Sequence, residues 1–494
     1  MEEARHWLPA AAAAALLLTV WGAAGVEVRN WGGDIATNCA EFVTVRSADD
    51  IVEVVRDGES YPAPVRALGS RHSNTKVIMA DGGTVVNMRK MNAILGHDES
   101  KLTVTVEAGA LYIDVSEYLQ KHGLMHYVNT EFGSISSGAA AVAHTKDAAF
   151  VGEHGQISSY VVGVKIVTAD GDKMTIDEDN HPELLRAVRS SYGLLGIVYE
   201  VTFRVRPLEL IMLWHRTYTL DDFLSKLDDI RSSGTSVMIY YYPYEDKMTV
   251  EFRAYHNNPA VNASEPNFLL SGKPLSWWAS LQFRVRNGFW GGVGPVFGRF
   301  INQMAAAPEW LTNGMASAFS AFLGLAGPFM SGGINYPPAQ MHRYPDDTPQ
   351  GQKIAFSLFS FPAHTFPDAL RAYYAFCQDH LRRTGWRTSL PHVGYRLYRD
   401  HSSLLSHSTE DESLSFDPVT VPDEGWYSFL EEYNEFCAQW GGTPLLNQTP
   451  HLKARHVQAQ EAYGKALPQF REVRRRMDPQ GRFLTPHLRD LLGL

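Results

Sequence analysis

The residues with the clearest chemistry lie in one short loop, Arg66-Ala-Leu-Gly-Ser-Arg-His-Ser-Asn74. The stretch 65–68 has the pattern of a strand that ends at this loop. Gly69 then allows a turn in which successive backbone N–H groups point into one concavity and hold an anion. His72 places an imidazole inside that turn. The alternative interpretation is a polar loop with a surface histidine, because Gly-x-x-His-Ser is a short motif.

A second stretch consists almost entirely of small residues, Phe132-Gly-Ser-Ile-Ser-Ser-Gly-Ala-Ala-Ala-Val-Ala-His144. Side chains this small let a flat ligand approach the backbone closely. Hydrophobic periodicity predicts strands at 84–88, 101–108 and 197–207 and helices at 112–122 and 184–191 around the two stretches. A ligand-binding α+β domain is therefore expected in the first part of the chain.

In order and spacing, these pieces resemble the flavin-binding domain of the vanillyl-alcohol oxidase and p-cresol methylhydroxylase (VAO/PCMH) superfamily, and within it alditol oxidases and sugar-lactone oxidases. The pieces that carry the resemblance are Asn30-Trp-Gly-Gly33, Arg66 to Ser73, Val106-Glu-Ala-Gly109, Gly133-Ser-Ile135 with Gly138, Val167 to Gly171, Ser191 to Val198 and Asp478 to Phe483. The resemblance implies an α+β fold of two domains. An FAD-binding domain of the PCMH type is expected over 27–207, an antiparallel-sheet cap covered by helices over 208–445, and a return to the first domain over 446–494.

The resemblance also implies FAD as the cofactor, with a single covalent link. In the relatives the histidine of the first loop is bonded to the 8α-methyl group of the flavin, and here that position is His72. No cysteine lies between Cys39 and Cys377, so a second link has no candidate. The cofactor-binding residues expected from the two loops and the later glycine turn are Arg66, Gly69, Ser70, Arg71, His72, Ser73, Ser134, Ile135, Ser137, Gly138, His144, Ile197 and Val198.

Residues for the donor are expected on the cap. Alditol oxidases use a Glu-x-Arg pair on a cap strand, and counting back from Leu404-Leu-Ser406 places that pair on Gly394 and Arg396. The arginine is present, and it can stabilise a developing alkoxide but cannot act as a base at neutral pH. The relatives also have a lysine near the return to the first domain, where this chain reads Leu446-Asn-Gln-Thr-Pro-His451.

A general base must therefore come from another residue. His451, Tyr395 and His392 have suitable chemistry, with a purely structural role as the alternative for each. The candidates for catalysis are therefore Arg396, His451 and Tyr395.

The resemblance implies that a C–OH group of a polyol, sugar or sugar lactone is oxidised to a carbonyl, with hydride passing to FAD and then to oxygen to give hydrogen peroxide. Ser137 aligns with a small residue beside ring carbon C4a, which favours oxygen as the acceptor. Two alternatives stay open. The first is an enzyme of the same fold that uses an apolar alcohol as donor, which the tryptophan-rich stretch 277–330 suggests, or an acceptor other than oxygen. The second is a flavin fold that has become a binding protein, which the missing carboxylate and lysine suggest.

Composition narrows the partners. A length of 494 residues suggests two domains, and a net charge of −10 argues against nucleic acid as a partner. The three cysteines, Cys39, Cys377 and Cys437, allow at most one disulfide and have no metal-ligand spacing, so no metal site is predicted.

The N-terminus and two sequons bear on location. An apolar run at 8–20 followed by small residues predicts a signal peptide over 1–26 and secretion, with a membrane anchor as the alternative. The sequons at Asn262 and Asn447 are compatible with a glycoprotein. The tryptophan-rich stretch of the cap is a second place where the chain could approach a membrane.

Overall fold

A computed structural model describes residues 25–209, 211–255, 341–349 and 353–494, together with 311, 314, 334 and 335. The predicted signal or anchor segment, apart from its last two residues, lies outside the described residues. Asn262 and nearly all of the tryptophan-rich stretch 277–330 lie outside them as well. Within the described ranges, every helix falls short of the length and apolar character that crossing a membrane requires.

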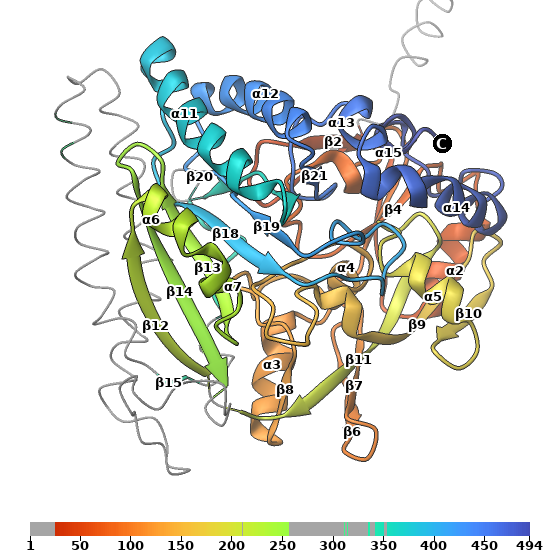
Figure 1. Cartoon of the computed structure of the whole chain (residues 1–494). Helices are drawn as coiled ribbons and strands as arrows, with labels where there is room; N and C mark the ends of the chain where they lie inside the picture. Colours follow the sequence, from red (N-terminus) through yellow and green to blue (C-terminus); the bar gives the residue numbers. More distant parts are fainter. Residues whose placement is uncertain are drawn as a thin grey trace, which may run out of the picture.

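The first hydrophobic core brings both ends of the chain together (Figure 1). A six-stranded antiparallel sheet has the order β10-β9-β11-β7-β6, with β8 paired to the end of β11, and a parallel sheet has the order β3-β5-β4. In β11, Val201, Phe203 and Val205 alternate into the core, as one face of a strand must. Helix α14 adds Leu467 and Phe470 at helical spacing, so the C-terminal return completes this core.

The elements around this core are β1 (Val26–Arg29), β2 (Ala36–Cys39), β3 (Glu41–Thr44), α2 (Ala48–Arg56), β4 (Val65–Leu68), η1 (Lys76–Ile78), β5 (Thr84–Asn87), β6 (Ile94–Asp98), β7 (Thr103–Glu107), α3 (Tyr112–Lys121), β8 (Leu124–His126), α4 (Ser137–Val142), η2 (Ile157–Tyr160), β9 (Val161–Val167), β10 (Lys173–Asp177), α5 (Pro182–Val188), β11 (Ile197–Pro207), α13 (Ala454–Gln458), α14 (Glu461–Met477) and α15 (Pro486–Leu492).

The second core lies under an eight-stranded antiparallel sheet of order β15-β12-β14-β13-β18-β19-β17-β21. Helices α11 and α12 run across one face of this sheet (Figure 1). Helix α11 buries Leu370, Tyr373 and Cys377, spaced three and four residues apart, in the same core as Ile239 and Tyr241 of β13. This arrangement confirms the predicted α+β class with an antiparallel cap sheet covered by helices.

The elements around the second core are β12 (Ile211–Tyr218), α6 (Leu220–Ser225), α7 (Leu227–Arg231), β13 (Ser236–Tyr242), β14 (Lys247–Tyr255), β15 (Ile334–Asn335), β16 (Ala355–Phe356), β17 (Phe359–Pro362), α11 (Phe366–Thr384), β18 (His392–Leu397), β19 (Ser413–Ser415), β20 (Val419–Thr420), α12 (Glu424–Gln439) and β21 (Thr443–Pro444). The domain boundaries at 207 and 445 stay a prediction.

A buried ion-pair network joins the cores. Arg253 of β14 donates to both carboxylate oxygens of Asp147, at 3.0 and 2.9 Å, and its Nε donates to Glu251 at 2.6 Å. All three side chains are nearly inaccessible to solvent. Because breaking one partner of a buried pair leaves an uncompensated charge, the network fixes the segment around Asp147 against the cap sheet.

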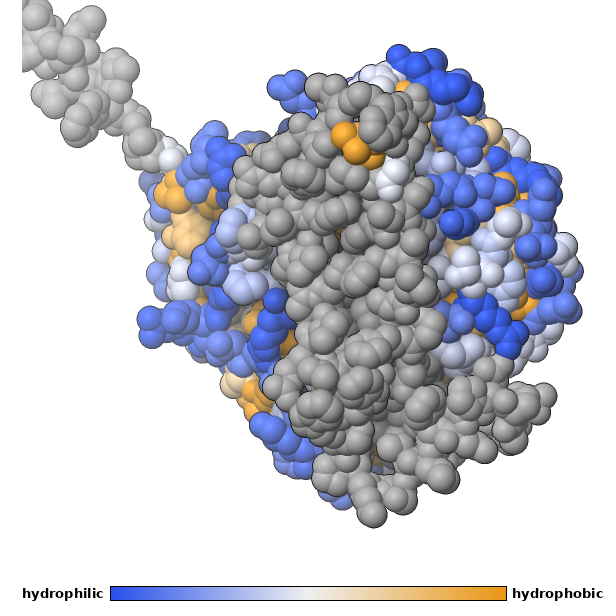
Figure 2. Space-filling view, turned by 90° about the vertical axis from the view of Figure 1, so that its left-hand side faces the viewer, coloured by the Kyte–Doolittle hydropathy of each residue, from blue (hydrophilic) through white to orange (hydrophobic). Residues whose placement is uncertain are grey.

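On the side of the molecule seen in Figure 2, most of the described surface is hydrophilic, and hydrophobic residues form small separate groups. Scattered exposed apolar residues of this kind are normal for a folded protein.

Candidate cofactor and donor site

Two adjoining cavities lie beside the loop 66–74. The smaller holds about 630 Å³ of free space and is lined only by residues of the first core. The larger holds about 1070 Å³, part of it open to solvent, and is lined by residues around His72 and Ile135 and by cap residues such as Tyr240 and Val393. The loop contributes Ser73 to the smaller cavity and His72 to the larger, and the small-residue stretch likewise contributes Ser136 and Ile135. Together they suit an elongated ligand with one end in each cavity.

The loop after β4 presents unpaired backbone donors. No hydrogen bond joins the N–H groups of residues 69–73 to another described residue. A Cβ atom on Gly69 would lie 1.9 Å from the Ser136 hydroxyl, so only glycine allows the two stretches to touch here. Successive N–H groups without partners bind anionic oxygens well, which is the behaviour predicted for this loop.

Arg66 organises the wall of the smaller cavity. Its guanidinium donates to the backbone carbonyls of Val77 at 2.8 Å, Phe483 at 2.9 Å, Gly193 at 3.2 Å and Tyr192. Burial lowers the pKa of this group to about 10, which still leaves it charged at neutral pH. Its hydrogen bonds go to carbonyl oxygens, and its Nε atom has no partner among the described residues. A buried positive charge at this wall favours an anionic ligand.

His72 sits in an aromatic box at the junction of the cavities. Its ring centroid lies 5.1 Å from that of Trp31, 5.7 Å from Phe132 and 6.4 Å from Tyr344. Both ring nitrogens are shielded from solvent, and neither has a hydrogen-bond partner in the described part of the chain. Burial lowers the pKa of His72 to about 4, so the imidazole is neutral at pH 7 and one nitrogen has a free lone pair.

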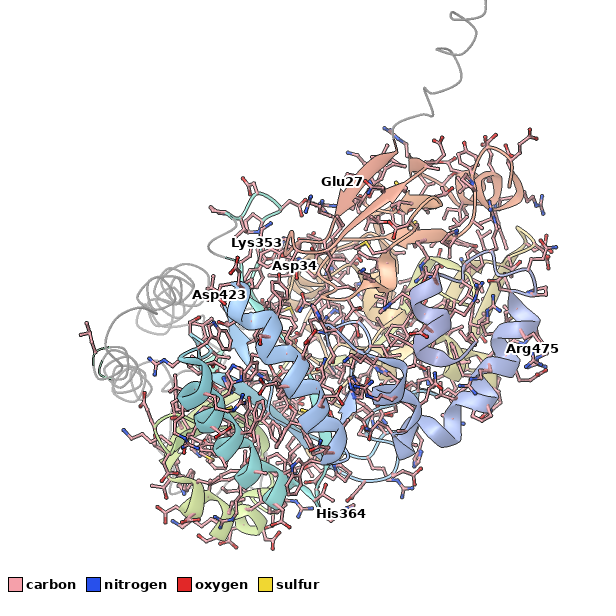
Figure 3. The ribbon with its side chains drawn as sticks, turned by 90° about the horizontal axis from the view of Figure 1, so that it is seen from above. Glu27, Asp34, Lys353, His364, Asp423 and Arg475 are labelled. Atoms are coloured by element: carbon pink, nitrogen blue, oxygen red, sulfur yellow. The ribbon has the colours of Figure 1, made fainter. Side chains whose placement is uncertain are left out.

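The aromatic wall around His72 is fastened across the two cores. The indole N–H of Trp31 donates to the carbonyl of Pro345 at 3.0 Å, and the ammonium of Lys353 lies 5.5 Å from the Trp31 ring centroid. Lys353 also lies beside Asp34, although the two are far apart in sequence (Figure 3). These contacts hold the box closed on the side of the N-terminal strands.

The other predicted cofactor residues divide into two groups. Those that line the smaller cavity are Arg66, Gly69, Ser73, Gly138 and Val198, and Ile135 joins His72 in the larger one. Ser70 and Arg71 complete the loop, where Arg71 has a φ of 66° and pairs with Asp346 at 3.5 Å.

Six predicted cofactor residues are absent from both cavity linings. Two of them are Ser70 and Arg71 of the loop, and in the other four the side chain has a structural partner or packs into the core. Ser134 accepts the N–H of Tyr344 at 2.7 Å, Ser137 donates to the carbonyl of Ala110 at 2.9 Å, His144 lies 2.9 Å from the Tyr192 hydroxyl, and Ile197 is a core residue. The Ser137 side chain is fully buried.

The larger cavity has one strongly polar end that the sequence did not indicate. Lys146 donates to Asp417 at 2.7 Å and to the hydroxyl of Ser415 at 2.8 Å, and its ammonium lies 4.4 Å from the centroid of the Tyr395 ring. Burial raises the pKa of Asp417 to about 6, against the opposing effect of Lys146. Lys146 and Asp417 come from segments 271 residues apart, so no local pattern could have paired them.

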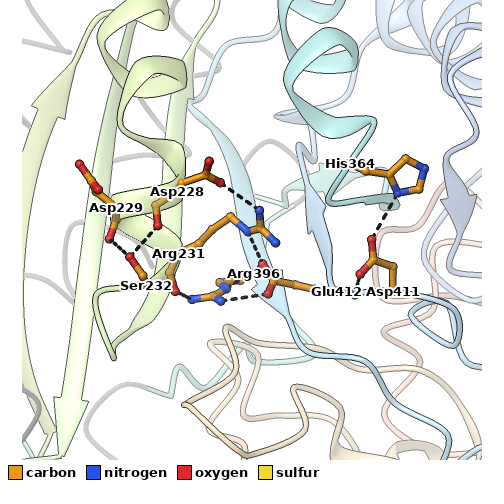
Figure 4. Close-up of polar contacts among 8 residues, drawn as sticks. All are labelled: Asp228, Asp229, Arg231, Ser232, His364, Arg396, Asp411 and Glu412. Carbon is orange, nitrogen blue, oxygen red and sulfur yellow. Dashed lines mark hydrogen bonds and ion pairs between the residues drawn. The ribbon is translucent and has the colours of Figure 1, made fainter.

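Arg396 does not reach this cavity, which corrects the prediction of a donor-binding arginine. On β18, Val393 and Tyr395 line the cavity, and the alternation of a strand turns Arg396 to the opposite face. There Arg396 pairs with Glu412 at 2.9 and 3.0 Å and donates to the carbonyl of Arg231 (Figure 4).

Gly394 lies on the same face of β18 as Arg396, which is the buried face turned away from the larger cavity. A Cβ atom on Gly394 would lie 2.2 Å from the carbonyl oxygen of Ser415 and 2.5 Å from the Tyr241 ring. A carboxylate therefore cannot occupy position 394 in this fold. Of the predicted donor residues, only Tyr395 faces the cavity.

The two histidines proposed as bases also lie elsewhere. His451 is exposed, has a φ of 58° and contacts Tyr427. His392 is buried on the face of β18 that is turned away from the cavity. The Tyr373 hydroxyl lies 2.6 Å from its Nδ1 atom, and burial lowers the pKa of His392 to about 3. Neither lines the larger cavity. The relatives have a lysine near the C-terminal return, and this chain has none there. Gln448 of the same segment lines the larger cavity.

Burial also determines the accessibility of the three cysteines and of the sequon at Asn447. Cys39, Cys377 and Cys437 are all buried free thiols. Asn447 is 3% exposed and donates to the carbonyl of His144 at 3.0 Å, so this sequon offers no accessible amide in the folded protein.

Comparisons with known proteins agree with this geometry. Residues 40–177 match a family described as FAD binding domain. The chain is 26% identical over 269 residues to the D-arabinono-1,4-lactone oxidase of Candida glabrata, covering 53% of this chain and 49% of that protein. It is 23% identical over 471 residues to the L-gulono-1,4-lactone dehydrogenase of Mycobacterium tuberculosis, covering 94% and 98%.

The solved structure of cholesterol oxidase from B. sterolicum aligns with a TM-score of 0.69 at 14% identity, covering 94% of this chain and 96% of that one. The chain spans about half the length of the first of the curated relatives above.

The match over residues 40–177 identifies an FAD-binding domain, and the larger cavity lies between this domain and the cap sheet. More closely, the chain has the fold of the VAO/PCMH superfamily, and its sequence relatives are sugar-lactone oxidases and dehydrogenases. The residues fit FAD, because the unpaired N–H groups of 69–73 and the charge of Arg66 suit a diphosphate and the neutral His72 faces the cavity that a flat ring would enter.

Proposed function

We propose that this chain is an FAD-dependent oxidoreductase that oxidises the CH–OH group of a small molecule to a carbonyl, with oxygen as the acceptor. The observation that carries the proposal is His72, a neutral imidazole with two unpartnered nitrogens at the junction of the two cavities. We infer that His72 forms the single covalent link to FAD. Bound FAD supplies the two-electron acceptor for the hydride of the donor.

In this proposal the chain has three tasks. The N–H groups of residues 69–73 and Arg66 bind the diphosphate of the cofactor. Trp31, Phe132 and Tyr344 exclude water from His72 and keep its imidazole neutral. The polar end of the larger cavity orients the hydroxyl of the donor, and the cap closes the cavity from the other side.

The donor is proposed to be a polyol, sugar or sugar lactone, because the relatives named above carry lactone substrates in their names. An apolar alcohol is the second candidate. It is favoured by the walls of the larger cavity, which are formed largely by apolar and aromatic side chains including Phe132, Ile354, Phe356, Leu390 and Val393. A sugar would leave several hydroxyl groups facing walls without partners, which is unfavourable.

The test begins with the purified protein and its visible spectrum. We expect flavin absorbance that remains with the precipitate after acid treatment, and we expect His72→Ala to release all of it. Asn74→Ala, a change in the same loop, is the matched control and should retain acid-stable flavin. Flavin that stays in the precipitate of His72→Ala would refute the covalent link.

A donor panel then separates the two substrate classes. Peroxide release is measured with sugar lactones, alditols and alicyclic alcohols under identical conditions. Turnover of lactones or alditols supports the first candidate, and turnover of alicyclic alcohols alone supports the second. Absence of bound flavin in every preparation would overturn the proposed function itself.

We further infer that residues 1–26 direct the chain to the secretory route, since an apolar run followed by small residues is typical of a signal peptide. The mass and N-terminal sequence of protein recovered from the culture medium test this. A mature chain that begins near residue 26 supports cleavage and export, whereas full-length chain retained with membranes supports an anchor.

A further inference from the structure

The larger cavity contains a buried acid and base pair that the proposed function leaves without an assigned role. Asp417 is 1% exposed and lies in the lining of the cavity that also contains His72. Its Oδ2 atom accepts from Lys146 at 2.7 Å and from the Ser415 hydroxyl at 3.1 Å. Its Oδ1 atom makes no hydrogen bond of ordinary length and angle to a described residue, although the backbone N–H of Phe359 lies close enough to the carboxyl to lower its pKa. A buried carboxylate oxygen without a partner is costly to maintain, which is typical of an atom whose partner is a ligand.

Lys146 complements this free oxygen. The ammonium group has three N–H donors, and the described contacts use two of them, on Asp417 and Ser415. The third can donate to the oxygen of a bound hydroxyl group. The Tyr395 ring, 4.4 Å away, keeps the ammonium in place.

We propose that Asp417 is the catalytic base that accepts the hydroxyl proton of the donor, and that Lys146 is the residue that positions and polarises it. This inference rests on the proposed function. The O–H bond of the donor breaks and its proton moves to Oδ1 of Asp417, while the C–H bond breaks and its electron pair leaves as hydride to FAD. The carbonyl product is neutral, FAD is reduced by two electrons, and the proton later leaves Asp417 for solvent.

Asp417 is preferred to its neighbours because of what each of them can accept. A charged Lys146 has no lone pair, and Tyr395 has a pKa raised well above its ordinary value by burial, so its phenol stays protonated. His407, which faces Lys146, is neutral because burial and the charges around it lower its pKa. Asp417 is the group here whose pKa, about 6, makes it both ionised at neutral pH and basic enough to take a proton.

The other groups around Asp417 do not titrate in the same range. Tyr241 of β13 and Tyr433 and Cys437 of α12 all have pKa values raised well above their ordinary values by burial. Glu131 is the second carboxylate in the lining of the cavity and is the rival base. Asp147 is a further buried carboxyl beside Lys146 whose pKa is raised by burial, but it pairs with Arg253 and does not line the cavity. If the rate falls on the acid side of a midpoint near pH 6, this acid limb of the pH profile has two candidate carboxylates in the lining, and variants of both are required.

The experiment measures the rate of flavin reduction by the best donor of the panel, without oxygen, from pH 5 to 9 in the holoenzyme. In the wild type we expect the rate to fall as pH falls below about 6. Asp417→Asn should lower the rate by about 10²- to 10⁴-fold and remove this limb, as expected for loss of a general base. Glu131→Gln should keep the limb.

Lys146 gives a readout that a structural role would not. Because Lys146 lowers the pKa of Asp417, Lys146→Met should move the limb to higher pH, and Lys146→Arg should restore it toward that of the wild type. An infrared band of a protonated carboxyl group that titrates near pH 6 and is missing in Asp417→Asn would identify the group without any turnover.

The outcomes separate the two levels of the argument. Failure of the wild type to bind flavin refutes the proposed function. Flavin bound normally by Asp417→Asn with an unchanged rate and limb refutes only the assignment of Asp417, as does a limb that disappears in Glu131→Gln. If Asp417→Asn does not fold, the paired variant Asp417→Asn with Lys146→Met removes both charges and should fold, because a neutral pair avoids an unpaired buried ion. A limb that persists in that variant also refutes the assignment.

Discussion

The loop 66–74 and the cap strand β18 show two different relations between sequence and site. In the loop, glycine and small polar residues determine the local backbone, and the structure forms a wall with free N–H groups at the predicted place. On β18 the prediction identified the strand and placed its donor-binding arginine on the wrong face. A strand turns alternate residues to opposite sides, so an error of one position in counting exchanges Arg396 for Tyr395.

We therefore expect substitutions in the loop to reduce both flavin binding and stability. Substitutions on the face of β18 that is turned away from the cavity should reduce stability alone.

The largest effect is expected at Arg66. Arg66→Met leaves the carbonyls of Val77, Phe483, Gly193 and Tyr192 without their donor, so we expect a loss of about 3 kcal/mol or more in the free energy of unfolding, together with loss of bound flavin. Urea denaturation followed by fluorescence measures the first effect. Arg29→Met, at an exposed pair with Glu27, is the control and should change stability by less than about 0.5 kcal/mol.

Gly69 tests the contact between the two small-residue stretches. Gly69→Ala forces a methyl group against the Ser136 hydroxyl, so we expect a loss of about 1–3 kcal/mol and a clear drop in the flavin-to-protein ratio. The ratio is read from the absorbance spectrum. Gly58→Ala, where the nearest atom of the added carbon would be 3.8 Å away, should leave the ratio unchanged. Equal ratios in the two variants would show that this close approach does not matter for the cofactor.

The two faces of β18 can be separated by one substitution on each. Arg396→Met should lower stability by about 1–3 kcal/mol through loss of its pair with Glu412, with less than a threefold change in the rate of flavin reduction. Tyr395→Leu should change that rate by tenfold or more, because it removes the ring that lies against Lys146 in the cavity. The reverse pattern, a rate loss confined to Arg396→Met, would restore the prediction made from the sequence.

The smallest effect at neutral pH belongs to buried histidines of the first core. Burial lowers the pKa of His126 to about 3, so below pH 6.5 the unfolded chain binds a proton that the folded chain does not. The free energy of unfolding should therefore fall as pH falls, by up to about 1.4 kcal/mol per pH unit from this residue. His126→Phe keeps the stacking on Tyr112 and should flatten the slope between pH 6 and 4. An unchanged slope would show that other groups dominate acid unfolding.

Much of the secondary structure could be predicted from the sequence. The strands β4 and β11 begin and end where hydrophobic alternation places them, and α3 ends within one residue of the helix predicted at 112–122. The strands β16 and β17 follow one another closely in the chain but pair with different strands, β20 and β19. Pairing partners come from distant parts of the chain, so local alternation could not reveal this.

The loop 66–74, the small-residue stretch beside it and the α+β arrangement could all be predicted from the chain alone, because these depend on glycine, side-chain size and local periodicity. Which side chains line the larger cavity depends instead on how distant segments pack. Lys146 and Asp417 meet because Arg253 fastens the segment around Asp147 to β14 while β19 leads Asp417 into the same cavity. The physical reason is that a buried ion pair forms between two distant segments. Neither the contact between the segments nor its burial can be read from a local pattern.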